Sequence, residues 1–294
     1  MKILITGSNG LLGQKLVKQL LKKQIPFLAT SKGENRNPNC PATCYAQMDI
    51  SKTSHVSNVF MDFQPTAVMH TAAITNVDYC ESNVEECELI NVTSTQILFE
   101  ASKQIGAQFI ALSTDFVFDG LEGNYKETDI PNPLSVYAQS KLDAETLIQK
   151  GSTDDWAIVR TIIVFGRGQH LSRSNIVLWA KEALESGKDL NIIDDQFRAP
   201  TWADDLAWAC IQIALLNKKG IYHISGPETF SIYDLVLRIA KFLNLDTKNV
   251  HKTTSESLNQ AAKRPPRTGF DLSKAHSEIG YKPMLFEESL KLLF

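Results

Sequence analysis

Short apolar runs alternate along most of the chain with longer segments whose apolar residues recur at helical spacing. The runs, each of four to six residues, are 2–6, 26–30, 67–70, 109–112 and 156–161. Between them, residues 51–63 and 84–103 have the pattern of helices, with Ser51 as the expected N-cap of the first. Strands that alternate with helices predict an α/β fold with a Rossmann-like, doubly wound parallel sheet.

This regular alternation loosens after Gly166. We expect residues 1–165 to form the sheet domain, and roughly 200–224 to return to it as a helix and a strand. Residues 166–199 and 225–294 are then expected to form a smaller, discontinuous substrate-binding lobe. It would lie over the carboxyl edge of the sheet, where open α/β sheets bind their ligands.

The first apolar run leads into a glycine-rich turn and then into a helical pattern. Gly7, Gly10 and Gly13 follow the spacing Gly-x-x-Gly-x-x-Gly. Gly7 permits a tight turn, Gly10 lets backbone N–H groups approach a pyrophosphate, and Gly13 lets helix and strand pack closely. A turn without a ligand has the same pattern, but the place between a strand and a helix favours dinucleotide binding by residues 1–165.

The second apolar run ends in Thr30-Ser31-Lys32, with Arg36 soon after. A site selective for NAD usually has Asp or Glu near this position, where it holds the ribose 2′-hydroxyl. A hydroxyl and a cation, Ser31 and Lys32, suit a 2′-phosphate instead, so the sequence predicts a preference for NADPH, with NADH possible. The alternative is that Lys32 and Arg36 belong to a solvated loop.

Tyr137 and Lys141 stand four residues apart where another helical pattern begins. At this spacing two side chains lie one turn apart on the same helix face. An ammonium beside a phenol favours the phenolate, so we expect the pKa of Tyr137 to fall toward the working pH, as suits a general acid or base. The alternative is a solvated Lys beside a half-buried Tyr, which occurs by chance on many helices.

Polar and small residues follow two of the apolar runs. Ser113-Thr114-Asp115 comes after the run 109–112, and Thr71-Ala72-Ala73 comes after the run 67–70. In an open parallel sheet, hydroxyls at the carboxyl end of a strand lie where ligands bind. Small residues there let a flat ring lie against the backbone, although plain packing also selects them.

Composition narrows the class of protein. The 294 residues are 43% hydrophobic and 21% charged, with a net charge of −3 at pH 7, so we expect neither nucleic acid nor membrane as a partner. No apolar run approaches the roughly 20 residues of a spanning helix, and the N-terminal run is too short for a signal peptide. The five cysteines lack a Cys-x-x-Cys pair, and the six histidines lack ligand-like spacing. These features predict reduced thiols, a cytoplasmic location and no bound metal.

Taken together, the motifs resemble the extended short-chain dehydrogenase/reductase family across essentially the whole chain. The shared pattern comprises the glycine-rich turn, Asp49-Ile50, Ala72-Ala73, residues 113–115 and the Tyr137–Lys141 pair. Within that family, residues 73–81, 113–120 (STDFVFDG) and 199–201 (APT) are similar to dTDP-4-dehydrorhamnose reductases.

The resemblance implies an activity and a set of site residues. The activity is the NADPH-dependent reduction of the C4 ketone of a nucleotide-linked deoxysugar, most closely dTDP-4-dehydro-L-rhamnose to dTDP-L-rhamnose. The implied catalytic residues are Thr114, Tyr137 and Lys141, and Thr114 and Asp115 are implied to touch the sugar. The residues implied to line the dinucleotide are Gly10, Leu11, Leu12, Asp49, Ile50, Thr71, Ala72 and Ala73, together with Tyr137 and Lys141.

Three positions depart from the reductases. Ile163 stands where they often carry a Trp that walls the sugar, which leaves the substrate open. Lys15 stands where some carry a Glu associated with magnesium at a dimer contact, so we expect no metal and leave a homodimer possible. Arg198 stands where they often have Gly, and it either reaches the substrate diphosphate or lies at the surface. Arg264 and Arg267 are further candidates for the diphosphate.

Three other functions are compatible with the sequence. The first is an epimerase or dehydrogenase that acts on another nucleotide sugar; epimerases of this family keep NAD tightly bound. The second is a regulatory role like that of the regulatory subunit of methionine adenosyltransferase, which acts through a partner. The third is a domain that senses NADPH without turnover. The complete set of Thr114, Tyr137 and Lys141 favours an enzyme.

Overall fold

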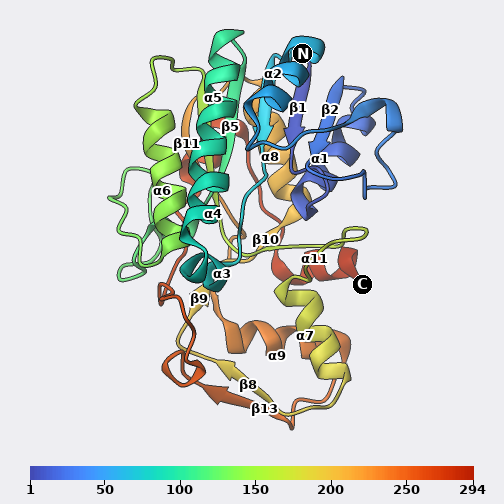
Figure 1. Ribbon diagram of the computed structural model, residues 1–294. Coiled ribbons are helices and arrows are strands. Elements are labelled where there is room, and N and C mark those ends of the chain that lie inside the picture. Colours follow the sequence, from blue (N-terminus) through green and yellow to red (C-terminus); the bar gives the residue numbers. More distant parts are fainter.

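The computed structural model describes residues 1–294, and a seven-stranded sheet lies at the centre of its larger part (Figure 1). The strands lie in the order β11-β6-β5-β4-β1-β2-β3, and every neighbouring pair is parallel. They span β1 Ile3–Thr6, β2 Phe27–Ser31, β3 Tyr45–Gln47, β4 Ala67–His70, β5 Gln108–Thr114, β6 Trp156–Thr161 and β11 Gly220–Ile224. The prediction of a doubly wound parallel sheet is confirmed, and the strand order reverses between β1 and β4.

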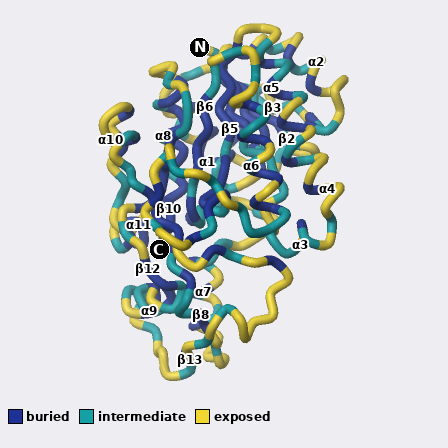
Figure 2. Tube along the Cα trace, turned by 90° about the vertical axis from the view of Figure 1, so that its left-hand side faces the viewer, coloured by how far each residue is buried: buried dark blue, intermediate teal, exposed yellow.

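Helices cover both faces of this sheet. One face carries α1 and α8, and the other carries α2, α5 and α6. Their bounds are α1 Leu11–Lys22, α2 Thr53–Phe63, α5 Ser94–Gln104, α6 Val136–Gln149 and α8 Ala203–Leu215. Ile3 and Ile5 pack on the first face and Leu4 on the second, because successive side chains of a strand point in opposite directions. Burial on both faces (Figure 2) explains why the strands are uninterrupted apolar runs.

Two predicted helices differ in detail from the structure: one is interrupted by a wider turn, and the other starts at a different residue. The expected helix 84–103 consists of α4 (Val84–Glu88), a π-helical turn (Leu89–Thr93) and α5. The wider turn lies around the buried Asn91, whose side chain bonds outside the helix. Helix α2 starts at Thr53 rather than after a Ser51 cap, because Ser51 instead donates to Asp49 Oδ1 from its N–H and its hydroxyl.

Several elements after β6 build a smaller part, drawn below the sheet in Figure 1. Its core joins α7, α9 and α11 around Val177, Leu235 and Phe286. Strand β8 pairs with β13 and β7 with β10 in parallel, and β9 pairs with β12 antiparallel. The elements span β7 Val164–Phe165, α7 Ile176–Glu185, β8 Leu190–Ile193, β9 Phe197–Arg198, β10 Thr201–Trp202, β12 Phe230–Ser231, α9 Ile232–Leu243, β13 Val250–Thr253 and α11 Phe286–Leu293.

The division into two domains stays a proposal, and two contacts bear on its boundaries. Helix α8 packs against α1 and β11 pairs with β6, so both elements lie with the sheet. Helix α10 (Ser273–Ile279) falls in the expected substrate lobe, yet it buries Ala275 and Ile279 in the core of the sheet. Local pattern gives no sign of this return, because the neighbours of α10 are far away in the sequence.

The remaining short elements are α3 (Val77–Ser82) and the 3₁₀ turns Ala42–Cys44, Asp115–Val117 and Glu256–Leu258. None of the helices combines the length and the apolar character needed to cross a membrane.

Candidate active site

The glycine-rich turn joins β1 to α1 and excludes side chains at two of its glycines. An added Cβ at Gly13 would lie 2.5 Å from the carbonyl oxygen of Gly7. At Gly7, whose φ is +70°, an added Cβ would lie 2.7 Å from the Ala72 nitrogen. At Gly10 the nearest atom would be 3.3 Å away, and this residue is exposed. Gly7 and Gly13 therefore serve close packing, while Gly10 is exposed and less tightly surrounded.

The N-terminus of α1 is suited to an anion. Its first turn carries no acidic residue and no side-chain cap, so the N–H groups of Leu11 and Leu12 have no partner within the helix. Ser8 Oγ is buried in the same turn without a hydrogen-bond partner. This set of donors fits the pyrophosphate of a dinucleotide.

Residues 71–73 follow β4, the parallel neighbour of β1, and lie against the glycine-rich turn. Thr71 Oγ1 donates to the Thr6 carbonyl oxygen over 2.7 Å, and the Ala72 N–H donates to Thr6 Oγ1 over 3.3 Å. Two candidate cofactor segments thus meet where the strand order reverses, which is the point at which open α/β sheets bind ligands.

The end of β2 carries the residues expected to select the cofactor. The Lys32 side chain is 78% exposed, and its Nζ lies 3.4 Å from Asp49 Oδ2. Ser31 Oγ lies 2.6 Å from Asn9 Nδ2 and 2.5 Å from the Tyr45 hydroxyl. Lys32 is therefore accessible to a ligand, whereas Ser31 already has protein partners.

Arg36 and Ile50 take different places around this edge. Arg36 is exposed, and its backbone N–H donates to Asn9 Oδ1 over 2.8 Å. Ile50 is buried in the core cluster of the second sheet face. Its side chain packs inside the protein, so the backbone of Ile50, rather than its side chain, would make the implied contact with the dinucleotide.

Tyr137 and Lys141 lie on α6, whose N-terminus is capped by Ser135. Both are buried, at 8% and 5% exposure, so the alternative of a solvated Lys beside a half-buried Tyr is wrong. Burial lowers the pKa of Lys141 to about 8, against the opposing charge of Glu145. Burial also raises the pKa of Tyr137, against a hydrogen bond with Thr114. The expected fall in the Tyr137 pKa is therefore wrong for the chain by itself, because desolvation outweighs the hydrogen bond with Thr114.

Thr114 ends β5, and its hydroxyl already has partners. It donates to Asp115 Oδ1 over 3.1 Å and accepts from the Phe116 N–H over 3.2 Å. The other Asp115 oxygen accepts from Thr268 Oγ1 and lies 3.8 Å from Arg198 Nε. The implied contact of Asp115 with a sugar does not fit this arrangement, because protein groups enclose its carboxylate.

Arg198, on β9, is neither at the surface nor free to bind a diphosphate. It is 2% exposed. Its guanidinium donates to the carbonyl oxygens of Pro265 over 2.6 Å and Phe197 over 2.7 Å. The same group lies 5.3 Å from the centre of the Phe116 ring. Both sequence-based alternatives for Arg198 are therefore wrong, since its donors are used inside the protein.

Arg264 and Arg267 are the other candidates for the diphosphate. Arg264 Nη2 lies 2.6 Å from Asp78 Oδ2, in an ion pair. Arg267 is exposed, and its guanidinium lies 4.3 Å from the centre of the Phe197 ring. Of these two, Arg267 keeps its charge available to a ligand.

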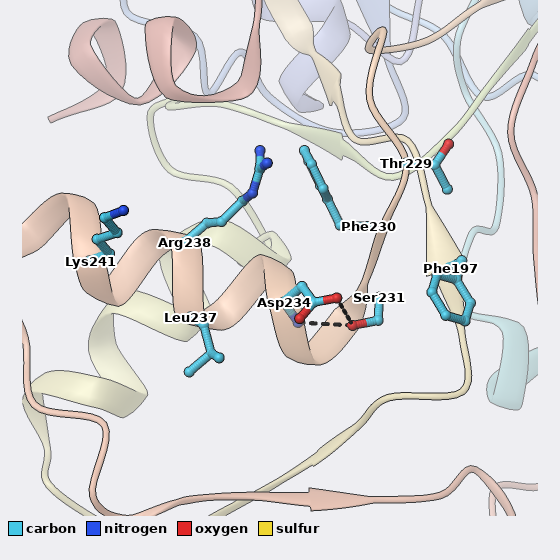
Figure 3. Close-up of a pocket in the computed structure, with 8 residues that line it drawn as sticks. All are labelled: Phe197, Thr229, Phe230, Ser231, Asp234, Leu237, Arg238 and Lys241. Atoms are coloured by element: carbon cyan, nitrogen blue, oxygen red, sulfur yellow. Dashed lines mark hydrogen bonds between the residues drawn. The ribbon is translucent and has the colours of Figure 1, made fainter.

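A cavity of about 320 Å³ lies beside α9, in the smaller part of the protein (Figure 3). Arg238 Cζ lies 3.9 Å from the centre of the Phe230 ring, and Nη1 pairs with Glu228 at 3.2 Å and with Glu287 at 3.1 Å. Two carboxylates balance this guanidinium, and Lys241 is a second cation on the cavity wall. Its lining residues are Phe197, Thr229, Phe230, Ser231, Asp234, Leu237, Arg238 and Lys241.

The other two departures from the reductases are Lys15 and Ile163. Lys15 joins α1 to α8, with its Nζ 2.7 Å from Asp204 Oδ2 and 5.4 Å from the Trp202 ring centre. Ile163 has a φ of +30°, which β-branched residues rarely adopt, and its carbonyl oxygen accepts from the Thr201 N–H over 3.1 Å. No group of three or more His, Cys, Asp or Glu side chains gathers to hold a metal ion.

Sequence reasoning missed two residues that brace the site. Asn91 accepts from the Ile74 N–H over 2.9 Å and donates to the Ile74 carbonyl and to Ser140 Oγ, each over 3.0 Å. Glu81 Oε1 accepts from the Val136 N–H over 2.8 Å. These bonds tie the loop after β4, and α3, to α6. A polar residue inside a long helical pattern was the available signal for Asn91; the partner of Glu81 has no local signal.

Comparison with known proteins agrees with this geometry. Residues 1–294 match the family model described as RmlD substrate binding domain. The chain is 32% identical to dTDP-4-dehydrorhamnose reductase of Aggregatibacter actinomycetemcomitans, over 99% of this chain and 97% of the relative. It is 30% identical to methionine adenosyltransferase 2 subunit beta of Xenopus tropicalis, over 93% and 81%.

Among solved structures, dTDP-4-dehydrorhamnose reductase from Bacillus anthracis str. Ames in complex with NADP matches with a TM-score of 0.87. The identity is 26%, and the match covers 100% of this chain and 98% of that one. The chain therefore belongs to the RmlD substrate-binding-domain family and is an oxidoreductase of the short-chain dehydrogenase/reductase type.

Proposed function

We propose that the chain uses NADPH to reduce the C4 ketone of a nucleotide-linked deoxysugar, most closely dTDP-4-dehydro-L-rhamnose to dTDP-L-rhamnose. The observation that carries the proposal is the meeting of Thr114 with Tyr137, one helical turn from Lys141, at the carboxyl end of β5. Further support comes from a relative named as this reductase and from a similar structure crystallised with NADP.

Tyr137 is the proposed proton donor to the oxygen that develops at C4, while a bound NADPH supplies the hydride. Burial raises the pKa of Tyr137, so the phenol carries its proton at neutral pH. A donor that already holds its proton beside the substrate is in the correct state for general acid catalysis.

Lys141 is proposed to hold the nicotinamide ribose and to stabilise the phenolate left on Tyr137. Its pKa of about 8 keeps most of the ammonium protonated at pH 7. A charge in a buried site stabilises an opposite charge more strongly than it does in water. Thr114 is proposed to orient the substrate carbonyl, for which its hydroxyl proton turns away from Asp115 Oδ1.

Lys32 is the proposed partner of the 2′-phosphate, since its side chain is exposed at the end of β2. The 2′-phosphate would compete with Asp49 for this ammonium. The phosphate carries more negative charge than the Asp49 carboxylate, and this difference is the proposed basis of the preference for NADPH over NADH. Arg267 is the proposed partner of the substrate diphosphate, because it is exposed beside β9.

To test this proposal, purified protein is mixed with NADPH and dTDP-4-dehydro-L-rhamnose, and the absorbance of the reduced nicotinamide is measured over time. The proposal expects that absorbance to fall while a product with two added hydrogens accumulates, as identified by mass spectrometry. An epimerase would instead be purified with NAD bound and would interconvert sugars without net use of NADPH.

A regulatory role is the second candidate, because the chain is also 30% identical to methionine adenosyltransferase 2 subunit beta. A regulatory subunit would bind NADPH in the same assay without consuming it. The presence of Thr114, Tyr137 and Lys141 as buried side chains, with Thr114 beside Tyr137, supports the enzyme over this alternative.

A further inference from the structure

Glu145 lies on the same face of α6 as Tyr137 and Lys141. It follows Lys141 by four residues and Tyr137 by eight, a spacing that aligns side chains along one side of a helix. Its side chain is 2% exposed, although carboxylates are rarely buried without a partner. The proposed mechanism gives Glu145 no role.

The partner of Glu145 is Arg160 on β6. Arg160 Nη2 lies 2.6 Å from Glu145 Oε2, and Nε lies 3.0 Å and 3.2 Å from the two carboxylate oxygens. Arg160 is itself buried, 5.1 Å from the centre of the Phe118 ring, with Nη1 3.4 Å from His223 Nε2. A bidentate pair in such packing holds the carboxylate in one orientation.

Lys141 and Glu145 both line an internal cavity of about 10 Å³, together with His70, Thr95 and Ser113. This volume is at the lower limit of the space that holds one water molecule. Ser113 Oγ is buried there without a hydrogen-bond partner. Charges on the walls of so small a space interact with little screening. Glu145 is the one carboxylate on these walls.

The other titratable groups that face Lys141 come from β4, α4 and α6 itself. His70 on β4 is neutral, because burial and the charge of Lys141 lower its pKa to about 3. Cys87 on α4 is a buried thiol, and Tyr137 is a neutral phenol before the reaction. Of the two charges that raise the pKa of Lys141, that of Glu145 is larger than that of Cys87.

We propose that Glu145 is a positioning residue for the reductase reaction: oriented by Arg160, it supplies the counter-charge that keeps Lys141 protonated beside Tyr137. This inference rests on the proposed function. Burial lowers the pKa of Lys141 to about 8 even with Glu145 in place, so loss of the carboxylate lowers it further. Lys141 would then be neutral over part of the range in which the wild type is active.

The experiment compares Glu145→Gln with the wild type in two pH profiles, kcat/KM for NADPH oxidation and NADPH affinity by nucleotide fluorescence. A neutral Lys141 loses its attraction for the anionic dinucleotide and for the phenolate. At low pH, kcat/KM and NADPH affinity of the variant should therefore equal those of the wild type. As pH rises, both quantities should begin to fall about one pH unit below the pH at which they fall in the wild type. Profiles that coincide with those of the wild type overturn the inference.

Glu185→Gln is the matched control. Glu185 follows Lys181 by four residues on α7, but this ion pair of 2.6 Å is exposed, so the substitution should shift neither profile. If Glu145→Gln does not fold, the double variant Glu145→Gln/Arg160→Met replaces it, because it removes both buried charges together. The double variant should shift both profiles in the same direction by a smaller amount, because loss of the Arg160 cation partly offsets loss of the carboxylate. Failure of both variants to fold would mark the pair as purely structural and overturn the inference.

The two proposals fail in different ways. A wild type that binds NADPH without consuming it, with every sugar nucleotide offered, contradicts the reductase. The affinity profile still decides the role of Glu145 in that case, because it needs no turnover.

Discussion

The hydroxyl of Thr114 donates a hydrogen bond of 3.1 Å to Asp115 Oδ1. The residue that sequence motifs assign to the substrate carbonyl is therefore held by a buried carboxylate in the free protein. That carboxylate is fixed in turn by Thr268 and Arg198. When substrate binds, the Thr114 hydroxyl would have to donate to the substrate carbonyl instead of to Asp115 Oδ1. Thr268 and Arg198 keep Asp115 hydrogen-bonded and paired during this change.

Arg198→Met should destabilise the protein. The substitution leaves Asp115 without its cation and leaves the carbonyl oxygen of Pro265 without a donor. Removing one partner of a buried pair costs about 3–5 kcal/mol, which should appear as a lower free energy of unfolding in urea. The exposed Arg267→Met should stay within about 0.5 kcal/mol of the wild type. Equal losses in the two variants would contradict the internal role of Arg198.

Stability should fall as pH decreases from about 7 to 5. Burial, the largest cause in each case, lowers the pKa of His70 and of His223 to about 3, from an ordinary value of 6.5. The unfolded chain therefore takes up protons first, so stability is complete above pH 6.5 and is lost as pH falls toward 3. Between pH 7 and pH 5, each histidine should lower the free energy of unfolding by about 2 kcal/mol. Urea unfolding at pH 7 and at pH 5 measures this loss.

His70→Gln separates the two contributions. It should roughly halve the pH dependence, because His223 still titrates. A free energy of unfolding that is the same at pH 7 and pH 5 in the wild type would show that these imidazoles are not buried as neutral groups.

Lys32→Ala should weaken the use of NADPH and leave that of NADH nearly unchanged. The ammonium is exposed at the end of β2, where a 2′-phosphate can reach it in competition with Asp49. A hydrogen bond to a charged group contributes about 1.5–3 kcal/mol, so kcat/KM for NADPH should fall about tenfold or more. Lys52→Ala, also exposed, is the control. Equal efficiency of the wild type with NADPH and NADH would rule out this selection.

Gly13→Ala should destabilise the protein and abolish tight binding of the dinucleotide. Its Cβ would lie 2.5 Å from the Gly7 carbonyl oxygen, which forces the turn apart at a cost of about 1–3 kcal/mol. Gly33→Ala meets no atom within 4 Å and serves as the control, measured in the same thermal melts. A Gly13→Ala variant as stable as Gly33→Ala would mean that the turn is loosely packed.

Much of the architecture follows from local sequence. Uninterrupted apolar runs predict the central strands because the sheet buries both of its faces, and the glycine spacing predicts the turn at β1 because two glycines have no room for a Cβ. The helix that carries Tyr137 and Lys141 is also correctly predicted, since the helical pattern that begins there is a local feature.

What the sequence misses depends on distant contacts. The burial of Arg198 is set by segments near Asp115 and Pro265, far away in the chain, so local composition made it look like a ligand or a surface residue. The pKa of Tyr137 was expected to fall because its Lys neighbour is visible in the sequence and its desolvation is not. The π-helical turn at Asn91 also depends on distant contacts, since the Asn91 side chain bonds to Ile74 and Ser140.

The central claim is that Tyr137 donates the proton in a reduction driven by NADPH. The most direct test measures NADPH oxidation with dTDP-4-dehydro-L-rhamnose by the wild type, by Tyr137→Phe and by the control Tyr79→Phe, whose ring is 40% exposed. We expect kcat to fall about 10²–10⁴-fold in Tyr137→Phe alone, with NADPH affinity retained. A Tyr137→Phe variant within a few-fold of the wild type would contradict the account.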